Sequence, residues 1–392
     1  MDFHLLTNYL DLLDEEYGIK ALDVIVTKDH DVVYRRMVGH SDHACTVPVS
    51  EEDRYYLYSA TKVMTMTATM QLIEQGKIGL YDPIAKFMPE WAHMTVIDAD
   101  YDSVGPSYKP RITDPSHYAR RPVRVIDCMS MSSGLTYDMA SDAIRELLAK
   151  NPDATTREVA GAMARMPLVF EPGTRYLYSM GHDVMGAVIE IVSGEKLSQY
   201  LQNHVFGPLG VHELTMHLSD EEKKHLSAQW RYDDETRRIV PIPMPNGFRI
   251  SKNFESGGGM LAGTVNGYST VIDALANGGV GRNGVRILNE ESVLMFTHSV
   301  LTGKQLEDFR KGRFLEYGYG LGVRVKMTPA GFAGWSPAGE FGWDGAAGAW
   351  AMIDPTLHLS AFYAMHVRGF GYSYDVIHPT LRGLIYEGLT EP

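Results

Sequence analysis

The spacing of hydrophobic residues predicts strands near both ends of the chain and mostly helices between them. Near the N-terminus apolar residues recur every three or four positions, which predicts an amphipathic helix with these residues on or near one face: Leu5, Leu6, Tyr9, Leu10 and Leu13. Two β-branched runs around a polar turn then predict a hairpin over residues 21–39. The N-terminal part should therefore supply a helix and two paired strands.

Further along the chain the pattern becomes helical and later returns to strands. A helix is predicted to start near Ser59 and to end at Gly76 as its C-cap. Other helices are predicted at 123–131, 156–166, 181–192, 197–205 and 265–277. Strands are predicted at 319–326, 347–354 and 358–366, with a turn signal at Asp354-Pro355-Thr356 between the last two.

This order suggests one sheet assembled from both termini around a helical insertion. We expect residues 1–78 and 250–392 to form an α/β sheet domain and residues 79–249 to form a mainly helical inserted domain. The active site is expected between these two parts. A chain of 392 residues, 44% of them hydrophobic, is long enough for this arrangement.

Charge and hydropathy exclude several classes of partner. The formal net charge of −13 argues against nucleic acid, which favours a basic surface. No run approaches the ~18 apolar residues of a membrane span, and no basic-then-apolar leader precedes the first helix. We therefore expect a cytoplasmic protein, or an exported one already in its mature form. The sequence leaves its oligomeric state open.

Few residues point to a cofactor, a metal or a disulfide. Cys45 and Cys128 are too few for a disulfide framework and are expected to be buried thiols. No His-Glu-x-x-His pattern occurs, so no metal is expected. Gly257–Gly259 superficially matches a dinucleotide fingerprint, but no convincing strand precedes it. Close backbone packing near the active site is the better interpretation, and no cofactor is predicted.

The sequence Ser-Ala-Thr-Lys at 59–62 can carry nucleophilic chemistry. On a helix, residues three apart share a face, so the Lys62 amine can hydrogen-bond the Ser59 hydroxyl. Where burial or another cation favours the neutral amine, Lys62 could take the serine proton during attack. The Ser59 N–H, at a helix N-terminus, could help to hold an oxyanion. Alone the pattern is weak, because it recurs at Ser193–Lys196, where we predict a helix end and turn.

Further motifs follow in order along the chain. They are Glu-Gln-Gly-Lys-Ile-Gly-Leu-Tyr-Asp-Pro-Ile at 74–84, a stretch at 123–135 ending in Ser-Gly-Leu, Glu-Pro-Gly-Thr-Arg-Tyr-Leu-Tyr-Ser-Met at 171–180, Gly-Pro-Leu-Gly at 207–210 and Glu-Ser-Gly-Gly-Gly-Met at 255–260. Together they closely resemble class C beta-lactamases, D-alanyl-D-alanine carboxypeptidases and related beta-lactamase-like esterases of the penicillin-binding-protein superfamily. The resemblance covers roughly residues 21–366. It implies a beta-lactamase/transpeptidase-like α+β fold, with an antiparallel sheet flanked by helices.

The resemblance also implies roles for individual residues. Ser59 would be the nucleophile, Lys62 its proton acceptor and Tyr178 a second acid/base group that serves the leaving group and the hydrolytic water. A tyrosine hydroxyl ordinarily titrates near ~10, so a cation such as Lys62 would have to favour the phenolate. How Lys62 and Tyr178 divide this work stays open, and Tyr176 is expected to pack.

Two departures from the family pattern bear on the substrate. Met180 stands where relatives have an asparagine that contacts a substrate amide, and methionine cannot donate those hydrogen bonds. In the last motif, 341–346, Trp343 replaces a cation that would hold a substrate carboxylate, and Gly345 is retained. Ala346 would supply the second oxyanion N–H beside that of Ser59. We hypothesise that Asp344 faces the pocket and attracts an amine; capping of a turn beside Gly345 is the alternative.

These observations favour a serine hydrolase that forms an acyl-enzyme on Ser59 and cleaves small esters or amides. Two alternatives remain: a D-amino-acid peptidase or weak beta-lactamase, and a non-catalytic acyl-ligand-binding protein of the same fold. An α/β-hydrolase is disfavoured, because the nearest Gly-x-Ser-x-Gly-like stretch, 334–339, has its last glycine one position late. It also places Pro337, which has no N–H, beside the serine.

Overall fold

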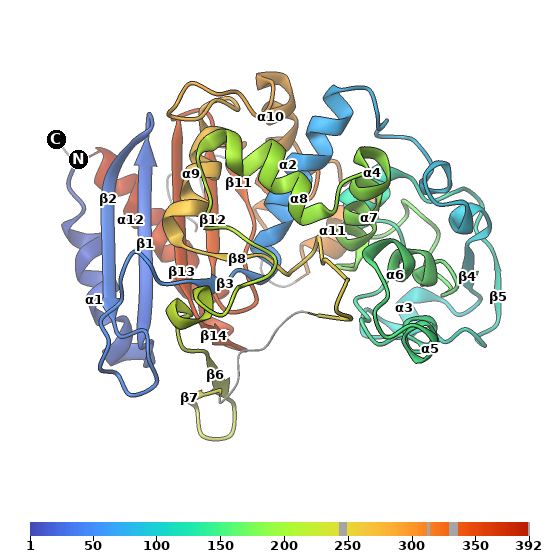
Figure 1. Cartoon of the computed structure of the whole chain (residues 1–392), viewed down its shortest axis with the longest axis horizontal. Coiled ribbons are helices and arrows are strands. Elements are labelled where there is room, and N and C mark those ends of the chain that lie inside the picture. The colour runs from blue at the N-terminus through green and yellow to red at the C-terminus, as the bar shows by residue number, and fades with distance from the viewer. Residues whose placement is uncertain (243–248, 312–313, 329–335, 391–392) are drawn as a thin grey trace.

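The two ends of the chain build one sheet. A computed structural model of the chain describes residues 1–242, 249–311, 314–328 and 336–390. In spatial order the strands of its main sheet are β2 (Asp31–Gly39), β1 (Ala21–Lys28), β13 (Leu359–Met365), β12 (Trp350–Asp354), β11 (Phe341–Gly342), β10 (Arg324–Lys326) and β9 (Tyr317–Tyr319). Every neighbouring pair is antiparallel. The N-terminal hairpin joins the C-terminal strands through β1 and β13, as the sequence predicts (Figure 1).

Alternation of side chains along the strands places helices on both faces of this sheet. On β1, Val24 and Val26 pack with α1 (His4–Tyr17) and α12 (His378–Thr390), whereas Ile25 belongs to the core on the opposite face. α9 (Val265–Ala276) covers that opposite face, against β1, β12 and β13. Because successive strand residues point to opposite sides, one apolar strand can serve two cores.

The N-terminal helix α1 forms where its apolar spacing predicts. Leu6, Leu10 and Leu13 are fully buried, and each such burial contributes roughly 1.5–3 kcal/mol. Leu5, which we placed on or near the same face, is 39% exposed. The helix ends at Gly18, whose φ of +77° is a left-handed conformation that glycine adopts without a Cβ clash.

The middle of the chain contains more helices than strands, joined by long loops. Its helices are α3 (Tyr101–Val104), α4 (Val125–Met129), α5 (Asp142–Lys150), α6 (Thr156–Met163), α7 (Gly181–Ser193) and α8 (Leu197–Leu201). Short strands are β4 (Thr95–Ile97) with β5 (Ser116–Tyr118), and β6 (Trp230–Asp233) with β7 (Arg238–Pro241). β6 also pairs with β14 (Val367–Arg368), so the chain returns to the sheet side before residue 250. The two-domain division itself stays a prediction.

Two predicted strands differ in the structure. The stretch 319–326 is split between β9 and β10 by a tight turn, because Gly320 and Gly322 break the run and Gly322 has a φ of +92°. β12 begins at Trp350 and not at Ala347, because the Gly345 N–H bonds the Ala349 carbonyl at 2.8 Å and closes a turn there. The remaining helices are α10 (Glu290–Phe296) and α11 (Gly303–Phe309).

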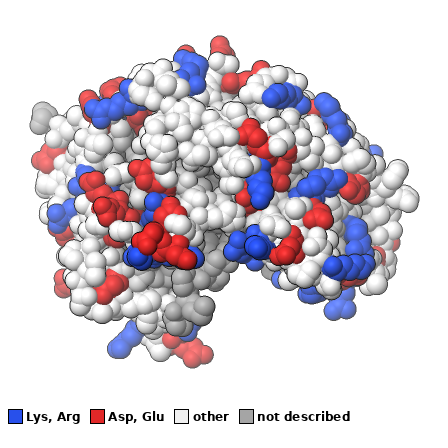
Figure 2. All heavy atoms as spheres, viewed as in Figure 1, with Lys and Arg blue, Asp and Glu red and all other residues white. Residues whose placement is uncertain are grey.

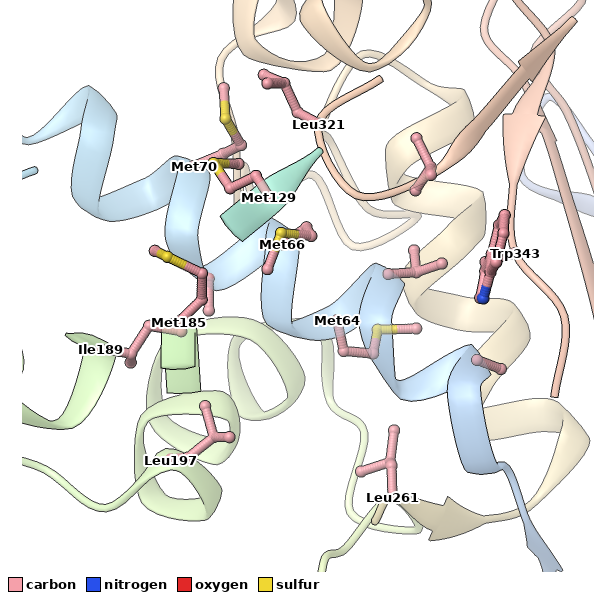
Figure 3. Close-up of a cluster of buried hydrophobic side chains, with 14 of the residues drawn as sticks. Met64, Met66, Met70, Met129, Met185, Ile189, Leu197, Leu261, Leu321 and Trp343 are labelled. Atoms are coloured by element: carbon pink, nitrogen blue, oxygen red, sulfur yellow. The ribbon is translucent and has the colours of Figure 1, made fainter. Parts of the chain in front are cut away.

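The helix α2 (Thr61–Glu74) runs through the centre of the molecule. Twelve of its fourteen residues are buried, so almost every face of it packs against protein. Figure 3 shows Met64, Met66 and Met70 among side chains that include Met185 of α7 and Leu197 of α8. Gly76, with a φ of +67°, ends the helix as predicted. A polar group at the start of α2 is therefore shielded from bulk water.

The surface and the cysteines complete the fold. Cys128 is buried as expected, Cys45 is half-buried, and neither forms a disulfide. Figure 2 shows acidic and basic side chains intermixed over the face it presents. In the part of the chain that the structure describes, no helix is both long and apolar enough to cross a membrane.

Candidate active site

Ser59 lies just before α2, in a single 3₁₀ turn formed by Tyr58–Ala60. The turn follows the short strand β3 (Tyr55–Tyr56), which pairs with β8 (Ala262–Gly263). Tyr58 has a φ of +46°, an unfavourable conformation for a residue with a β-carbon, and its buried hydroxyl donates to Gln229 Oε1 at 2.7 Å. Strained backbone of this kind is held by surrounding contacts and is concentrated at functional sites.

Lys62 is fully buried at the first turn of α2. Its Nζ donates to the Gly258 carbonyl at 2.6 Å and lies 3.4 Å from Ser59 Oγ. The predicted one-turn spacing therefore brings the amine to the serine hydroxyl. A buried amine needs polar partners to offset its loss of water, and the Gly258 carbonyl is one of them.

Two further buried ionisable residues lie beside Lys62, at the start of α7. Burial raises the pKa of the Asp183 carboxyl, and the Lys62 charge opposes that rise. Asp183 Oδ1 accepts from Ser256 Oγ at 2.5 Å and from the Gly258 N–H at 3.3 Å. Burial, followed by the Lys62 charge, lowers the pKa of His182 to about 3, so this imidazole is neutral near pH 7.

Glycines 257 and 258 let the backbone approach this buried group, as expected from the sequence. A β-carbon on Gly257 would lie 2.4 Å from the His182 carbonyl oxygen. A β-carbon on Gly258 would lie 2.8 Å from Asp183 Oδ2 and 3.3 Å from Lys62 Nζ. Because real Cβ contacts are longer, glycine is needed here for the Gly258 carbonyl to reach Lys62.

Tyr178 completes the group around the serine. Its hydroxyl donates to Ser59 Oγ at 2.7 Å, and Lys62 Nζ lies 4.7 Å from the centre of its ring. The ring stacks between Tyr137, at 5.4 Å and 2°, and Trp343, at 5.6 Å and 24°. The Trp343 Nε1–H donates to the Tyr178 hydroxyl oxygen at 3.3 Å. Tyr178 therefore contacts the serine hydroxyl directly, which is the geometry that a general acid or base needs.

The turn that contains Gly345 and Ala346, the candidate oxyanion segment, lies directly against the turn that carries Ser59. A β-carbon on Gly345 would lie 2.4 Å from the Leu57 carbonyl oxygen, so glycine permits the close approach. The next residue, Ala346, is exposed to the same cavity as Ser59. Its N–H makes no hydrogen bond with any residue that the structure describes, which leaves it available to a ligand.

Asp344 lines the cavity, but its carboxylate already has a cation. Arg324, which is buried on β10, donates Nη1–H to Asp344 Oδ1, and His378 Nδ1 lies 3.9 Å from Oδ2. The side chain of Asp344 is only 14% exposed. Our hypothesis that the Asp344 carboxylate attracts an amine is therefore not favoured by this geometry, because Arg324 offsets its charge.

Met180 lies away from the cavity that Ser59 lines. It is 2% exposed at the N-terminus of α7 and faces a separate small space beside Leu135, Met163 and Met166. Met180 therefore forms no part of the wall of the Ser59 cavity. Its expected role in substrate contact has no support in this geometry.

The cavity itself has a volume of about 580 Å³ and is lined mostly by apolar surface. Ser59, Tyr178, Gly345 and Ala346 lie on its wall together. Six aromatic residues line it besides Tyr178: Tyr101, Tyr176, Phe309, Phe314, Trp343 and Tyr374. A deep, largely apolar pocket with a few convergent polar groups is the usual form of a small-molecule site. Tyr176, which we expected to pack, also contributes a surface to it.

Three residues of the site, Asp183, Tyr137 and Arg324, were not predicted from the sequence. Asp183 lies five residues after Tyr178, in the first turn of a helix, and this proximity was the one local signal for it. Tyr137 and Arg324 reach the site by folding, across 41 and 20 positions from their partners Tyr178 and Asp344. Ser336, from the rejected 334–339 stretch, is buried and donates to Glu340 Oε2 at 2.8 Å; positions 334–335 lie outside the described residues.

A family of known proteins matches this sequence and geometry. The Beta-lactamase family model matches residues 6–376, so the chain belongs to the beta-lactamase family, whose members have the α+β fold described above. Members of this fold family are hydrolases, and esterases are among the relatives of this chain.

Individual relatives are similar over most of their length. Protein Rv1367c of Mycobacterium tuberculosis is 30% identical over 83% of this chain and 80% of its own. Esterase EstB of Burkholderia gladioli is 25% identical over 89% of this chain and 86% of its own. The solved structure of EstCE1, a hydrolase with promiscuous acyltransferase activity, superposes with a TM-score of 0.78 at 22% identity and covers 98% of both chains. At that identity, the EstCE1 structure supports the fold alone.

Proposed function

We propose that this protein is a serine hydrolase that cleaves uncharged esters through an acyl-enzyme on Ser59. The observation that carries the proposal is the contact of Ser59 Oγ with two proton-exchanging groups, Tyr178 Oη at 2.7 Å and Lys62 Nζ at 3.4 Å, on the wall of an aromatic cavity. A serine hydroxyl becomes a useful nucleophile when such a base takes its proton.

The reaction follows from these contacts. Ser59 Oγ attacks the ester carbonyl carbon while its proton passes to Tyr178 or Lys62, and the N–H groups of Ser59 and Ala346 hold the resulting oxyanion. When the tetrahedral adduct collapses, the bond to the leaving alcohol breaks and the alcohol takes up that proton. Water then attacks the acyl-enzyme, gives a proton to the same base, and releases the acid and free Ser59.

An uncharged substrate is supported by the charges around the cavity. Trp343 occupies the position of a cation, and Arg324 is engaged by Asp344. Among the described residues that line the cavity, Lys311 is the only Lys or Arg, and it pairs with Asp308 at 3.0 Å. A substrate carboxylate would therefore lack a free partner, which disfavours D-amino-acid peptides and β-lactams relative to neutral esters.

A substrate panel tests the proposal. We expect the protein to hydrolyse p-nitrophenyl acetate and butyrate faster than a D-alanyl-D-alanine peptide or a chromogenic cephalosporin. A fluorophosphonate should label Ser59, as read by peptide mass mapping. A labelled Ser59 with no ester turnover would instead favour the acyl-ligand-binding alternative, and faster peptide cleavage would favour the peptidase.

Tyr178→Phe examines the second base. The variant keeps the ring stacked between Tyr137 and Trp343 but removes the hydroxyl, so kcat should fall by roughly 10²–10⁴, the usual contribution of acid–base catalysis. Tyr176→Phe, two residues away in the same cavity wall, is the matched control and should change kcat little. Equal effects of the two substitutions would argue against proton transfer by Tyr178.

A further inference from the structure

Arg175 connects two segments of the cavity lining that lie far apart in sequence. Its guanidinium donates to both carboxylate oxygens of Asp308, at 2.6 and 3.0 Å, and to both of Asp102, at 2.6 and 3.0 Å. Asp102 belongs to α3 and Asp308 to α11, 206 positions apart. Paired, parallel hydrogen bonds of this kind fix the orientation of both partners as well as their distance.

The joined segments are the ones that shape the cavity. Tyr101 and Pro106 lie near Asp102 in sequence, Phe309 and Phe314 lie near Asp308, and all four line the cavity. The Arg175 guanidinium also lies over the Tyr101 ring, at 4.7 Å from its centre. Arg175 and the two carboxylates that it holds, Asp102 and Asp308, form what we call the clamp. Arg175 is three residues before Tyr178, so one short segment carries both the centre of the clamp and a candidate proton-exchanging group.

One of the two ion pairs in the clamp, Arg175–Asp308, is almost fully buried. The side chains of Arg175 and Asp308 are only 11% and 5% exposed, whereas that of Asp102 is 59% exposed. The Arg175–Asp308 pair is thus part of the packed structure, and Asp102 brings α3 to it from the surface. Lys311 also pairs with Asp308. The two positive charges of Arg175 and Lys311 thus balance the two negative charges of Asp102 and Asp308.

We propose that Arg175 is a specificity-determining positioning residue, whose two-carboxylate clamp sets the width of the cavity for a neutral, ring-bearing part of the substrate. The inference rests on the proposed ester hydrolysis and adds the class of substrate to it. A volume of about 580 Å³ with aromatic walls is far larger than an acetyl or ethyl group needs. Ring systems stack on aromatic side chains and bury much apolar area.

The effect of the clamp on substrate preference can be measured with three esters. Ethyl acetate carries no ring, 2-naphthyl acetate carries rings in the alcohol, and ethyl 2-naphthylacetate carries them in the acyl group. We expect the wild-type protein to have a lower KM for at least one ring-bearing ester than for ethyl acetate. Arg175→Ala should raise that KM about tenfold or more and leave ethyl acetate hydrolysis within about threefold of wild type.

Further variants separate the clamp from general stability. Asp102→Asn removes the exposed arm alone and should give a smaller rise in the same KM, and Arg175→Lys should restore part of the preference. Arg165→Ala breaks a half-exposed pair with Glu146 elsewhere in the insertion and should change neither substrate class. If Arg175→Ala slowed all three esters equally, or left the ring-bearing esters unaffected, the inference would be overturned while ester hydrolysis stood.

A binding measurement keeps the two proposals distinguishable. The wild-type protein should bind 2-naphthol in calorimetry, and Arg175→Ala should weaken that binding about tenfold. If the wild-type protein hydrolysed no ester but bound 2-naphthol with this dependence, the proposed function would fail and the clamp would stand. Unchanged 2-naphthol binding in Arg175→Ala would overturn the clamp.

Discussion

The chain contains two Ser-x-x-Lys segments, one beginning just before α2 and the other at the C-terminal end of α7. In the first, Lys62 is fully buried, and Ser59 meets both Lys62 and Tyr178 on the wall of a cavity. In the second, Ser193 Oγ donates to the Ile189 carbonyl at 2.7 Å, Gly194 turns the chain, and Lys196 is exposed.

The difference shows that position on a helix and burial, rather than the spacing of two residues, decide the chemistry. A helix N-terminus presents N–H donors and a partial positive charge, which suit a developing oxyanion. A helix C-terminus presents carbonyl acceptors, and one of them, the Ile189 carbonyl, already accepts a hydrogen bond from the Ser193 hydroxyl. Ser59 contacts the side chains of Lys62 and Tyr178, whereas the Ser193 hydrogen bonds found among the described residues go to the backbone. Four tests, three of them with paired substitutions, can break or sharpen this contrast.

The largest difference in kcat is expected between substitutions of the two serines. Ser59→Ala removes the proposed nucleophile, and kcat for p-nitrophenyl butyrate should fall by roughly 10³ or more. Ser193→Ala removes a hydroxyl that caps a carbonyl and should leave kcat unchanged. Steady-state kinetics of the two purified variants make the comparison. Persistence of activity in Ser59→Ala would remove the acyl-enzyme from the mechanism.

Substitutions of the two lysines should differ almost as strongly in their effect on kcat. Lys62→Met keeps a long side chain in the buried space but removes the amine, so kcat should fall about 10³-fold. Lys196→Met changes an exposed side chain and should have no effect on kcat. Urea unfolding of both variants controls for stability. Comparable turnover in the two variants would show that the Lys62 amine takes no part in the reaction.

Two glycines give an intermediate test. A methyl group on Gly258 would collide with Asp183 and approach Lys62, so Gly258→Ala should displace the amine and lower kcat by about 10². Gly194, with a φ of +76°, has nothing within 4 Å of its Cβ position. Gly194→Ala should therefore cost about 1 kcal/mol of stability through its left-handed backbone and leave kcat intact. Kinetics and chemical unfolding, measured on both variants, distinguish the two outcomes.

The smallest expected effect is a change in the pH dependence of stability, caused by a residue beside the second Ser-x-x-Lys segment. Burial raises the pKa of Glu190 to about 7, and the Leu197 N–H donates to its Oε1 at 3.1 Å. Because the folded protein holds this proton more tightly than the unfolded chain, the stability that Glu190 contributes is lost as pH rises from about 4.5 through about 7. Glu190→Gln should flatten that decline in the free energy of unfolding by urea between pH 5 and 8. A variant with the wild-type pH profile would show that Glu190 is charged in the folded state.

Much of the fold could be predicted because its signals are local. The apolar spacing of Leu6, Leu10 and Leu13 defines α1 without reference to the rest of the chain. The split of 319–326 into two strands was missed, because a Gly-rich stretch with apolar neighbours has the same hydrophobic pattern whether it turns or continues. Ser59 and Lys62 were predicted as site residues because further family motifs follow them in order, whereas their spacing alone also occurs at Ser193–Lys196.

The remaining parts of the site depend on long-range contacts. Arg324 reaches Asp344 from a neighbouring part of the sheet, and this contact offsets a carboxylate that the sequence presents as free. Trp343, considered from the sequence as a substrate contact, also donates a hydrogen bond to Tyr178 across 165 positions. Such partners are set by strand pairing and packing, which no local spacing records.

The sequence by itself determined the family, the helix that carries Lys62, and the serine placed one turn before it. Their spacing is fixed by helical geometry over four residues, so it needs no distant part of the chain. Only the tertiary structure decided which of the two Ser-x-x-Lys segments is buried, which carboxylates are paired, and how Arg175 joins α3 to α11 across the cavity. These features arise from segments that meet only after folding, because burial and charge pairing depend on neighbours in space.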